Sequence, residues 1–476
     1  MSNFADYDRY DGLGLAALVR DGEVGADDVL EAAIARAEAV NPAINAICIE
    51  GYDRAREAVR HGLPDGPFRG VPFLLKNLYA MAAGVAQTNG SRLFADFVAD
   101  HDSEIVARFR RAGLVTFGQT NSPELGLCYT TEPRLYGPTR NPWNLDRVAG
   151  GSSGGAAAAV AAGIVPIAHA SDGGGSIRVP ASCCGLFGLK PSRGRVPSGP
   201  DVGEGWAGMS TAHAITRTVR DSAALLDVTA GPDVGAPYWA PPPSRPFLDE
   251  VGADPGRLRV AVSAAPPNGS PVAPDCVAAM EDAARLCAEL GHQVALAEPD
   301  YDKPAVAEAT TTVIAASTLA TLEQRAGALG RAPAAEDVER ATWALARIGE
   351  KVSGSAYVAA VQTLHGIGRQ VARFFGDHDV LLTPMLAQPP IAIGVLDMMT
   401  EDLDTYRDEM ASFAAFPVLS NVTGAPAMSV PLFWNDDDLP IGVQFVGRAS
   451  DEATLFRLAA QLEAAHPWAD RRPPPN

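Results

Sequence analysis

The stretch of sequence that decides the fold is GGSSGGAAAAVAAGIVPIAHASDGGGSIRVPASCCGLFGLKP, residues 150–191. It places two serines, Ser152 and Ser176, in separate glycine runs. Between these runs the sequence is apolar, and it predicts an Ala-rich helix over residues 156–163 and a short strand over residues 164–168. A flexible linker would lack this apolar segment, so the stretch predicts two ordered loops held by regular structure.

The glycines before Ser176 have a physical purpose. A residue without a Cβ atom lets neighbouring backbone N–H groups converge on one point, because no side chain blocks them and φ is unrestricted. The N–H groups of Gly173, Gly174, Gly175 and Ser176 are therefore candidate donors to a negatively charged oxygen. Losing one such donor costs about 3–4 kcal/mol of transition-state stabilisation in enzymes that use them. The pattern predicts an oxyanion-binding loop with Ser176 as the attacking hydroxyl.

The glycine runs could instead bind phosphate, and the serine needs a base. A phosphate-binding loop requires GK[ST] after the glycines, or GxGxxG at the start of a helix, and neither glycine run has these patterns. A nucleophilic serine, for its part, needs a base. His169 is the nearest histidine, but it lies in an apolar, strand-like run. A buried, neutral lysine is the other candidate base, and the residues alone leave both open.

The composition excludes several classes of function. The chain has 476 residues, 47% of them apolar and 20% charged, which is typical of a globular protein with a large core. Its net charge of −19 argues against nucleic acid and against anionic membranes as partners. The first residues lack the basic and apolar regions of a signal peptide, and no run of about 18 apolar residues is present. We therefore expect a cytoplasmic protein with no membrane span.

The cysteines give no sign of a metal site or of a disulfide framework. No CxxC pair is present, and disulfides are unusual in a chain of this length and type. We expect buried, reduced side chains at most of the six positions, which are Cys48, Cys128, Cys183, Cys184, Cys276 and Cys287.

Outside the glycine–serine stretch, short apolar runs alternate with amphipathic ones. Residues 70–75 predict a strand that ends at Lys76, and residues 26–40 predict a helix that Pro42 stops. Short strands alternating with helices indicate an α/β fold with a mixed sheet. The same reasoning predicts helices over residues 50–61, 103–112, 275–290 and 451–465, a mostly helical stretch over residues 304–375, and strands over residues 45–49, 114–117, 186–189, 258–262, 294–297, 380–382, 427–433 and 441–446, the last two as a hairpin.

The motifs together resemble the amidase signature family. GGSSGG and DGGGSIRVPASCCGLFGLKPSRGRV resemble its signature region, and GVPFLLKNL, FGQTNSPELG, YGPTRNPWN, TGAPAMSVPL and LPIGVQFVG resemble its other blocks. Within the family, TTEPRLYGPTRNPWN and HPWADRRP are most similar to the 6-aminohexanoate-cyclic-dimer hydrolases. The resemblance implies one amidase domain over residues 1–476, with the core signature region at about residues 70–200 and a mostly helical variable segment at about residues 300–375. Its fold is a central mixed, twisted β-sheet covered by helices on both sides.

The resemblance also assigns roles to particular residues. Ser176 becomes the nucleophile, Lys76 the base, and Ser152 the bridging serine, which follows a cis peptide bond in the family. The same pattern makes Gly173, Gly174 and Gly175 the oxyanion hole, and Gly126, Leu127 and Cys128 fall where family members line the acyl pocket. The supporting residues are read from their positions: Asp172 and Arg178 bracket the nucleophile and are expected to pair and fix its loop, and Ser153 is expected to bond loop backbone. Tyr129, Trp206 and Met385 are loop-placed candidates for substrate contact.

Two expectations about the chemistry follow. Relatives often carry a bulkier residue within the sequence Asp-Gly-Gly-Gly before the nucleophile, so the third glycine is expected to widen or loosen the hole. Lys76 must be neutral to accept a proton, and burial has to bring its pKa down from about 10.4. Since negative charge would oppose this, we expect acidic residues to be absent near Lys76.

The resemblance implies hydrolysis of a carboxylic amide C–N bond through an acyl-enzyme, with no metal and no cofactor. Cyclic or oligomeric amides such as 6-aminohexanoate dimers are the first candidate substrates. Carbamates (urethanes), aryl amides and esters are alternatives within the same chemistry. The amidase subunit of a tRNA-dependent amidotransferase is a third option. A small-molecule amide or carbamate is the expected partner, and the sequence leaves a homodimer open.

Overall fold

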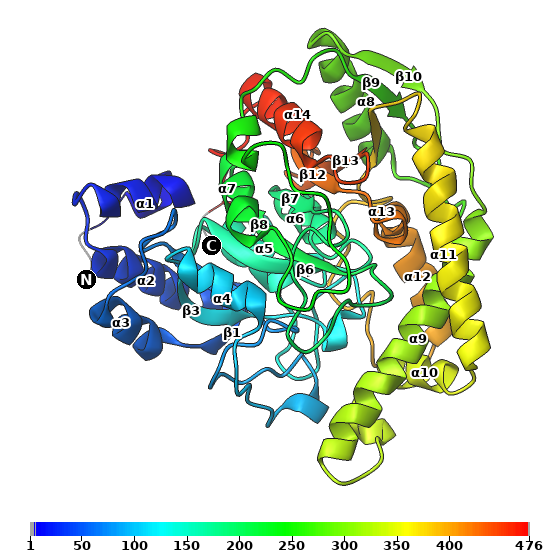
Figure 1. Cartoon of the computed structure of the whole chain (residues 1–476), viewed down its shortest axis with the longest axis horizontal. Helices are drawn as coiled ribbons and strands as arrows, with labels where there is room; N and C mark the ends of the chain where they lie inside the picture. The colour runs from blue at the N-terminus through cyan, green and yellow to red at the C-terminus, as the bar shows by residue number, and fades with distance from the viewer. Residues whose placement is uncertain (1–3, 5, 475–476) are drawn as a thin grey trace.

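The computed structural model describes residue 4 and residues 6–474, and its centre is an 11-stranded β-sheet with helices on both sides (Figure 1). The strand order is β1-β3-β2-β6-β8-β7-β12-β13-β11-β9-β10. In chain order these strands are β1 (Ile47–Glu50), β2 (Pro72–Lys76), β3 (Val115–Thr120), β6 (Ile167–Asp172), β7 (Phe187–Lys190), β8 (Thr211–Thr216), β9 (Arg259–Val262), β10 (Gln293–Leu296), β11 (Val380–Pro384), β12 (Ala427–Trp434) and β13 (Pro440–Gly447). A separate two-stranded ribbon joins β4 (Arg140–Asn141) and β5 (Asn144–Val148).

The sheet is mixed, as the sequence predicted. β2 runs parallel to β3 and to β6, and β9 runs parallel to β10 and to β11. The other pairs are antiparallel, including the predicted hairpin of β12 and β13. The carboxyl ends of parallel neighbours meet at one edge of a sheet, so the ends of β2 and β6 lie together.

Fourteen α-helices surround this sheet in the part of the chain that the structure describes (Figure 1). They are α1 (Gly12–Arg20), α2 (Ala26–Ile44), α3 (Tyr52–His61), α4 (Glu104–Arg111), α5 (Gly154–Ala161), α6 (Arg178–Cys184), α7 (Val219–Thr229), α8 (Pro274–Glu289), α9 (Lys303–Ala328), α10 (Arg340–Gly349), α11 (Gly354–Phe374), α12 (Leu403–Phe413), α13 (Val418–Thr423) and α14 (Glu452–Ala465). The Ala-rich helix α5 packs against β2, β3 and β6, and all of its residues are buried. Its small side chains let it lie close to the strands that carry the site.

Several predicted boundaries were wrong, and two of them have a clear cause. Pro42 does not stop α2, which continues to Ile44 and ends at Asn45 with a left-handed φ of 50°. β6 begins at Ile167 instead of residue 164, because Pro166 has no N–H to donate to the sheet. The strand instead runs on to Asp172, so the loop that carries Ser176 starts directly at its end.

Helix α9 is long and apolar in composition. It is the one helix among the described residues that is long and apolar enough to cross a membrane, judged by length and composition alone. It packs against α10 and α11, and its Val313, Ala315 and Leu322 are fully buried (Figure 1). The buried residues form one face of α9, and its other residues are half-buried or exposed, so the helix packs on the fold with one side.

Candidate active site

Lys76 lies at the carboxyl end of β2, a strand whose five residues are all buried. Its ammonium nitrogen donates to two hydroxyls, Ser152 Oγ at 2.7 Å and Ser171 Oγ at 3.0 Å. Ser171 belongs to β6, the parallel neighbour of β2, and Ser152 belongs to the loop before α5. The sheet therefore brings the predicted lysine and the predicted bridging serine together.

Burial changes the acid–base behaviour of Lys76. Removal from water lowers the pKa of this lysine to about 7, while the charge of Asp172 works in the opposite direction. The expectation that no acidic residue lies nearby was therefore wrong. Asp172 is paired with Arg178, and this cation offsets much of its negative charge. Near neutral pH a large share of Lys76 is then uncharged and able to accept a proton.

The two serine loops are joined directly by hydrogen bonds. The Gly151–Ser152 peptide bond is cis, as expected. Ser153 N donates to Ser176 O at 3.3 Å, and Ser153 Oγ donates to Ser171 O at 3.3 Å. Ser153 thus binds loop backbone, as predicted, and fixes the loop of Ser152 against that of Ser176.

Close packing explains why the loop before Ser176 consists of glycines. A Cβ atom on Gly173 would lie 2.6 Å from Cζ3 of Trp206. A Cβ atom on Gly175 would lie 2.7 Å from Cβ of Pro417, and Gly175 also has a φ of 132°, which side chains rarely permit. Any larger residue at either position would displace the loop.

The backbone N–H groups that could bind an oxyanion differ from the predicted ones in one respect. The N–H of Gly175 points inward and donates to Asp172 Oδ1 at 2.7 Å, so it does not serve as an oxyanion donor. The N–H groups of Gly173, Gly174 and Ser176 donate to no other group of the described chain. These three remain the candidate donors to an oxyanion.

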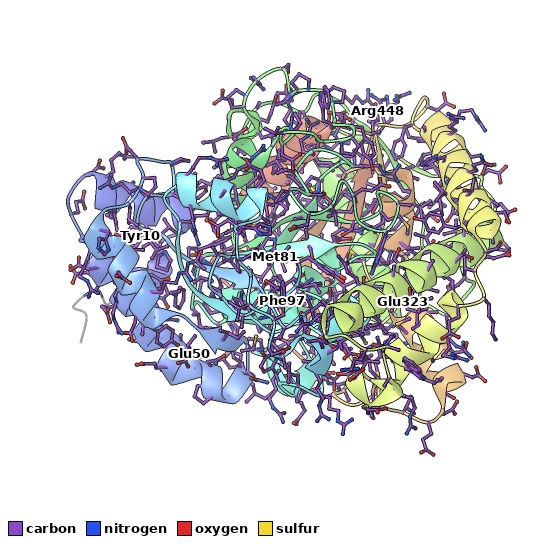
Figure 2. The ribbon with its side chains drawn as sticks, turned by 60° about the horizontal axis from the view of Figure 1, so that its bottom comes forward. Tyr10, Glu50, Met81, Phe97, Glu323 and Arg448 are labelled. Atoms are coloured by element: carbon purple, nitrogen blue, oxygen red, sulfur yellow. The ribbon has the colours of Figure 1, made fainter. Side chains whose placement is uncertain are left out.

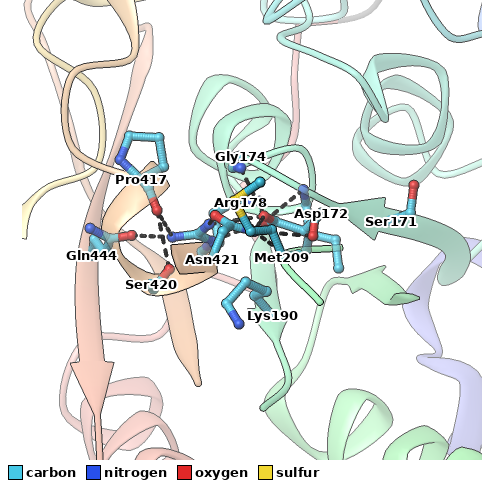
Figure 3. A network of polar contacts seen from close by, with 12 residues as sticks. Ser171, Asp172, Gly174, Arg178, Lys190, Met209, Pro417, Ser420, Asn421 and Gln444 are labelled. Atoms are coloured by element: carbon cyan, nitrogen blue, oxygen red, sulfur yellow. Dashed lines mark hydrogen bonds and ion pairs between the residues drawn. The ribbon is translucent and has the colours of Figure 1, made fainter. Parts of the chain in front are cut away.

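Asp172 and Arg178 form the predicted ion pair beneath this loop (Figure 3). Two hydrogen bonds of 2.9 Å join the guanidinium to the carboxylate, and both side chains are fully buried. Asn421 Nδ2 donates to Asp172 Oδ1 at 2.8 Å, and Arg178 Nη1 donates to Pro417 O at 3.0 Å. Burial by itself would raise the pKa of Asp172, but Arg178 and Asn421 outweigh it and hold the pKa well below its usual range.

We expect Asp172→Asn to lower the free energy of unfolding by about 3–5 kcal/mol, because it leaves the Arg178 guanidinium buried without its counter-charge. Urea unfolding followed by circular dichroism measures this. Asp404→Asn is the matched control, because Asp404 pairs with Arg407 at the surface, and it should change stability by less than about 0.5 kcal/mol. Equal effects of the two substitutions would contradict the structural importance of the buried pair.

A cavity of about 390 Å³ opens over the serines. Its lining includes Ser152, Ser171 and Ser176, together with Gly126 and Trp206. The segment that carries Met81 and helix α9 also contribute to the lining, and Figure 2 labels Met81 and, on α9, Glu323. The cavity therefore gives a small molecule access to the predicted nucleophile.

Four predicted pocket residues lie outside the lining of this cavity. The Cys128 thiol is buried near Thr130 Oγ1, and Met385 is part of the hydrophobic core. Leu127 packs against the core as well. Tyr129 has a different position from the one expected, because its hydroxyl donates to Gly174 O at 3.0 Å and so contacts the glycine loop before Ser176.

Two other buried bases do not contact the serines. His169 Nδ1 accepts the backbone N–H of Lys76 at 3.2 Å, and burial lowers the pKa of His169 to about 3. Lys190 has the same lowered pKa as Lys76, about 7, again through burial, but its Nζ donates to Pro191 O. A lowered pKa alone therefore does not separate these groups from Lys76, whereas the contact with Ser152 does.

The sequence did not reveal Ser171 as a partner of Lys76. Its position one residue before Asp172 is a signal only once β6 is known to be the parallel neighbour of β2. Among the described residues, no three or more His, Cys, Asp or Glu side chains are grouped so that they could hold a metal ion. All six cysteines are free.

Comparisons with known proteins agree with this geometry. The Amidase family model matches residues 28–456. A 6-aminohexanoate-cyclic-dimer hydrolase of Paenarthrobacter ureafaciens is 40% identical over 477 residues, covering 97% of this chain and 96% of that protein. A solved structure of 6-aminohexanoate cyclic dimer hydrolase superposes with a TM-score of 0.93 at 39% identity, covering 98% of this chain and 99% of the other.

A second structural relative is more distant in sequence. It is a bacterial aryl acylamidase of the amidase signature enzymes family, with a TM-score of 0.88 at 30% identity over 97% of both chains. The match extends along nearly the whole chain and includes the strands and loops that carry Lys76, Ser152 and Ser176. This chain belongs to the amidase signature family.

Proposed function

We propose that this enzyme hydrolyses amides through Ser176, Ser152 and Lys76. The observation that carries the proposal is a fully buried amine 2.7 Å from Ser152 Oγ, at a cavity that Ser152 shares with Ser176. Among the described residues its contacts are hydroxyls and no carboxylate pairs with it, so the amine is available as a base.

In the proposed mechanism, neutral Lys76 takes the Ser152 hydroxyl proton, and Ser152 takes the proton of Ser176. Ser176 Oγ then attacks the amide carbon, and the N–H groups of Gly173, Gly174 and Ser176 bind the resulting oxyanion. Ser152 passes a proton to the leaving nitrogen, because an amide anion is a poor leaving group. Water cleaves the acyl-enzyme by the reverse transfers.

Ser171 has a supporting part in this relay. A neutral amine has two N–H bonds and one lone pair, and donation of one N–H to Ser171 Oγ directs the lone pair toward Ser152. Among the described residues, Ser152 Oγ and Ser176 Oγ form no hydrogen bond with each other. Contacts of this kind commonly tighten only when substrate binds.

The lining of the cavity favours an uncharged substrate over an anionic one. Its walls include the apolar side chains of Met81, Ile105 and Leu125. Among the described lining residues, Asp201 and Glu204 are the only acidic side chains, and no Lys or Arg side chain lines the cavity. With relatives named 6-aminohexanoate-cyclic-dimer hydrolases, this supports cyclic or oligomeric aliphatic amides as the substrate class. The aryl acylamidase relative supports aryl amides as the second candidate.

A charge series tests this proposal. We expect an uncharged cyclic diamide to be cleaved with kcat/KM about tenfold or more above that of a linear amide of equal length ending in a carboxylate, because two negative side chains oppose the latter by roughly 1–2 kcal/mol. The Asp201→Asn/Glu204→Gln variant should narrow this ratio without raising the rate on the uncharged amide. Equal rates on both substrates in the native enzyme would contradict the assigned substrate class.

The cellular location and the assembly of the enzyme are proposed from the sequence and the cysteines, and not from the active site. Six free cysteines support the proposed cytoplasmic, reducing location. A single amidase domain remains a prediction, and a homodimer stays open, as it does in the sequence.

A further inference from the structure

We infer that Trp206 positions the oxyanion loop and selects the acyl group of the substrate. The inference rests on the proposed function and concerns one pair of residues, Gly173 and Trp206. The indole lies where a side chain at position 173 would lie, because a Cβ atom there would be 2.6 Å from Cζ3 and 2.7 Å from Cε3 of the ring. The Trp206 ring and a side chain at position 173 would therefore need the same space.

The contact bears on the expectation that the glycines before the nucleophile widen or loosen the hole. The third of them, Gly175, is closed in by Pro417, and the ring of Trp206 occupies the space beside the first, Gly173. Gly173 has no positive φ, so an alanine at this position would meet the ring without any backbone strain of its own. The size of residue 173 is therefore limited by Trp206 and not by the course of the loop.

Trp206 is held by an unusual turn. Trp206 and Ala207 both have a left-handed φ of 52°, which residues with side chains seldom adopt. Hydrogen bonds of 3.1 Å from the N–H groups of Gly208 and Ser210 to Gly205 O close the turn, and Met209 N donates to Trp206 O at 3.2 Å. The surrounding structure fixes a conformation that the residues themselves do not favour.

The turn is tied to the same network that supports the nucleophile loop (Figure 3). Asn421 Nδ2 donates to Met209 O at 3.1 Å and also to Asp172 Oδ1 at 2.8 Å. One buried amide thus contacts both the turn of Trp206 and the carboxylate beneath the glycines. Arg193 Nε adds a bond of 2.7 Å to Gly208 O. The ring is therefore fixed relative to the N–H groups of Gly173 and Gly174.

Trp206 also lines the catalytic cavity, as Ser176 and Gly173 do. A substrate carbonyl that places its oxygen on the N–H group of Gly173 brings its α-carbon next to the indole. An unbranched methylene fits against a flat ring, whereas a substituent on the α-carbon collides with it. The substrate class is then amides of unbranched, uncharged acyl chains.

Substitutions that change the side-chain size at positions 173 and 206, singly and together, test the inference. We expect Gly173→Ala to lower kcat at least about 100-fold, because the loop is pushed away from the oxyanion. Trp206→Ala should lower kcat about tenfold, change KM less, and improve α-methylated relative to unbranched amides. The Gly173→Ala/Trp206→Ala double variant should recover at least about tenfold over Gly173→Ala alone. Trp206→Phe, which keeps an aromatic ring, should retain most of kcat.

Trp239→Ala is the matched control, because Trp239 is 58% exposed and lies outside the lining of the cavity. It should leave kcat and acyl preference unchanged. Independent, multiplicative effects of the substitutions at 173 and 206, or an unchanged acyl preference in Trp206→Ala, would overturn the inference. Failure of the proposed function would look different, since the native enzyme would then cleave no amide at all. Thermal melts of every variant identify those that lose the fold.

Discussion

Ser176→Ala is expected to abolish amide hydrolysis, with kcat lower by about five to six orders of magnitude. Without the hydroxyl no acyl-enzyme forms, and the remaining donors and base have no nucleophile to serve. The fold should survive, because the side chain of Ser176 takes part in none of the buried polar networks around it and loses only one oxygen. Steady-state kinetics and a thermal melt of the same preparation measure both parts of this prediction.

Ser198→Ala is the matched control for that experiment. Ser198 lines the same cavity but belongs to the loop after β7, and its loss should change kcat less than about threefold. A fluorophosphonate probe adds a readout that needs no substrate, because it should modify the native enzyme and the Ser198 variant on the peptide that contains Ser176. Modification of another serine, or normal turnover in Ser176→Ala, would reject Ser176 as the nucleophile.

The sequence predicted those parts of the fold whose signal is local. β2 is an apolar run that ends at a lysine, and β12 and β13 are apolar runs separated by a polar turn. The helix α5 follows from its alanines. β8 was missed, because Ile215 is the one large apolar residue in its sequence TAHAIT, although the strand pairs with both β6 and β7. Its place is decided by those neighbours and not by its own residues.

Some features of the candidate site could likewise be predicted from the sequence, and others could not. Lys76, Ser152 and Ser176 could be picked out because a family pattern marks them. The occupation of Gly175 N–H by Asp172, the second partner of Lys76 at Ser171, and the ring of Trp206 against Gly173 could not. Each of these depends on how loops from distant parts of the chain meet, and a linear pattern does not record such distances.

Lys76→Met is expected to lower kcat by about four orders of magnitude or more, because the relay then has no final proton acceptor. In the native enzyme the same group should set the acidic side of the pH profile. Lys76 has a pKa of about 7, so it becomes protonated and inactive as the pH falls below that value, and kcat/KM should rise with pH through about 7 and then level off. The small residual activity of Lys76→Met should lack this step.

The same substitution is expected to affect stability in the opposite direction. The pKa of Lys76 falls from 10.5 to about 7 on folding, so the unfolded chain binds the proton more tightly. Between these two values the native state loses stability as the pH decreases, by roughly 4–5 kcal/mol at pH 7. Methionine carries no such cost, but it also leaves Ser152 and Ser171 without the amine. We expect Lys76→Met to unfold at an equal or higher urea concentration than the native enzyme at pH 7, and the advantage to shrink toward pH 10.

Lys190→Met separates the two effects. Lys190 is equally buried and has the same lowered pKa, about 7, but it contacts no serine of the site. Its replacement should bring a comparable gain in stability at pH 7, while kcat stays within about tenfold and the pH step near 7 persists. If Lys190→Met removed that step, or if Lys76→Met kept it, the base would have to be sought elsewhere. A catalytic lysine is distinguished by what its lone pair faces, and only Lys76 faces a serine hydroxyl at the cavity.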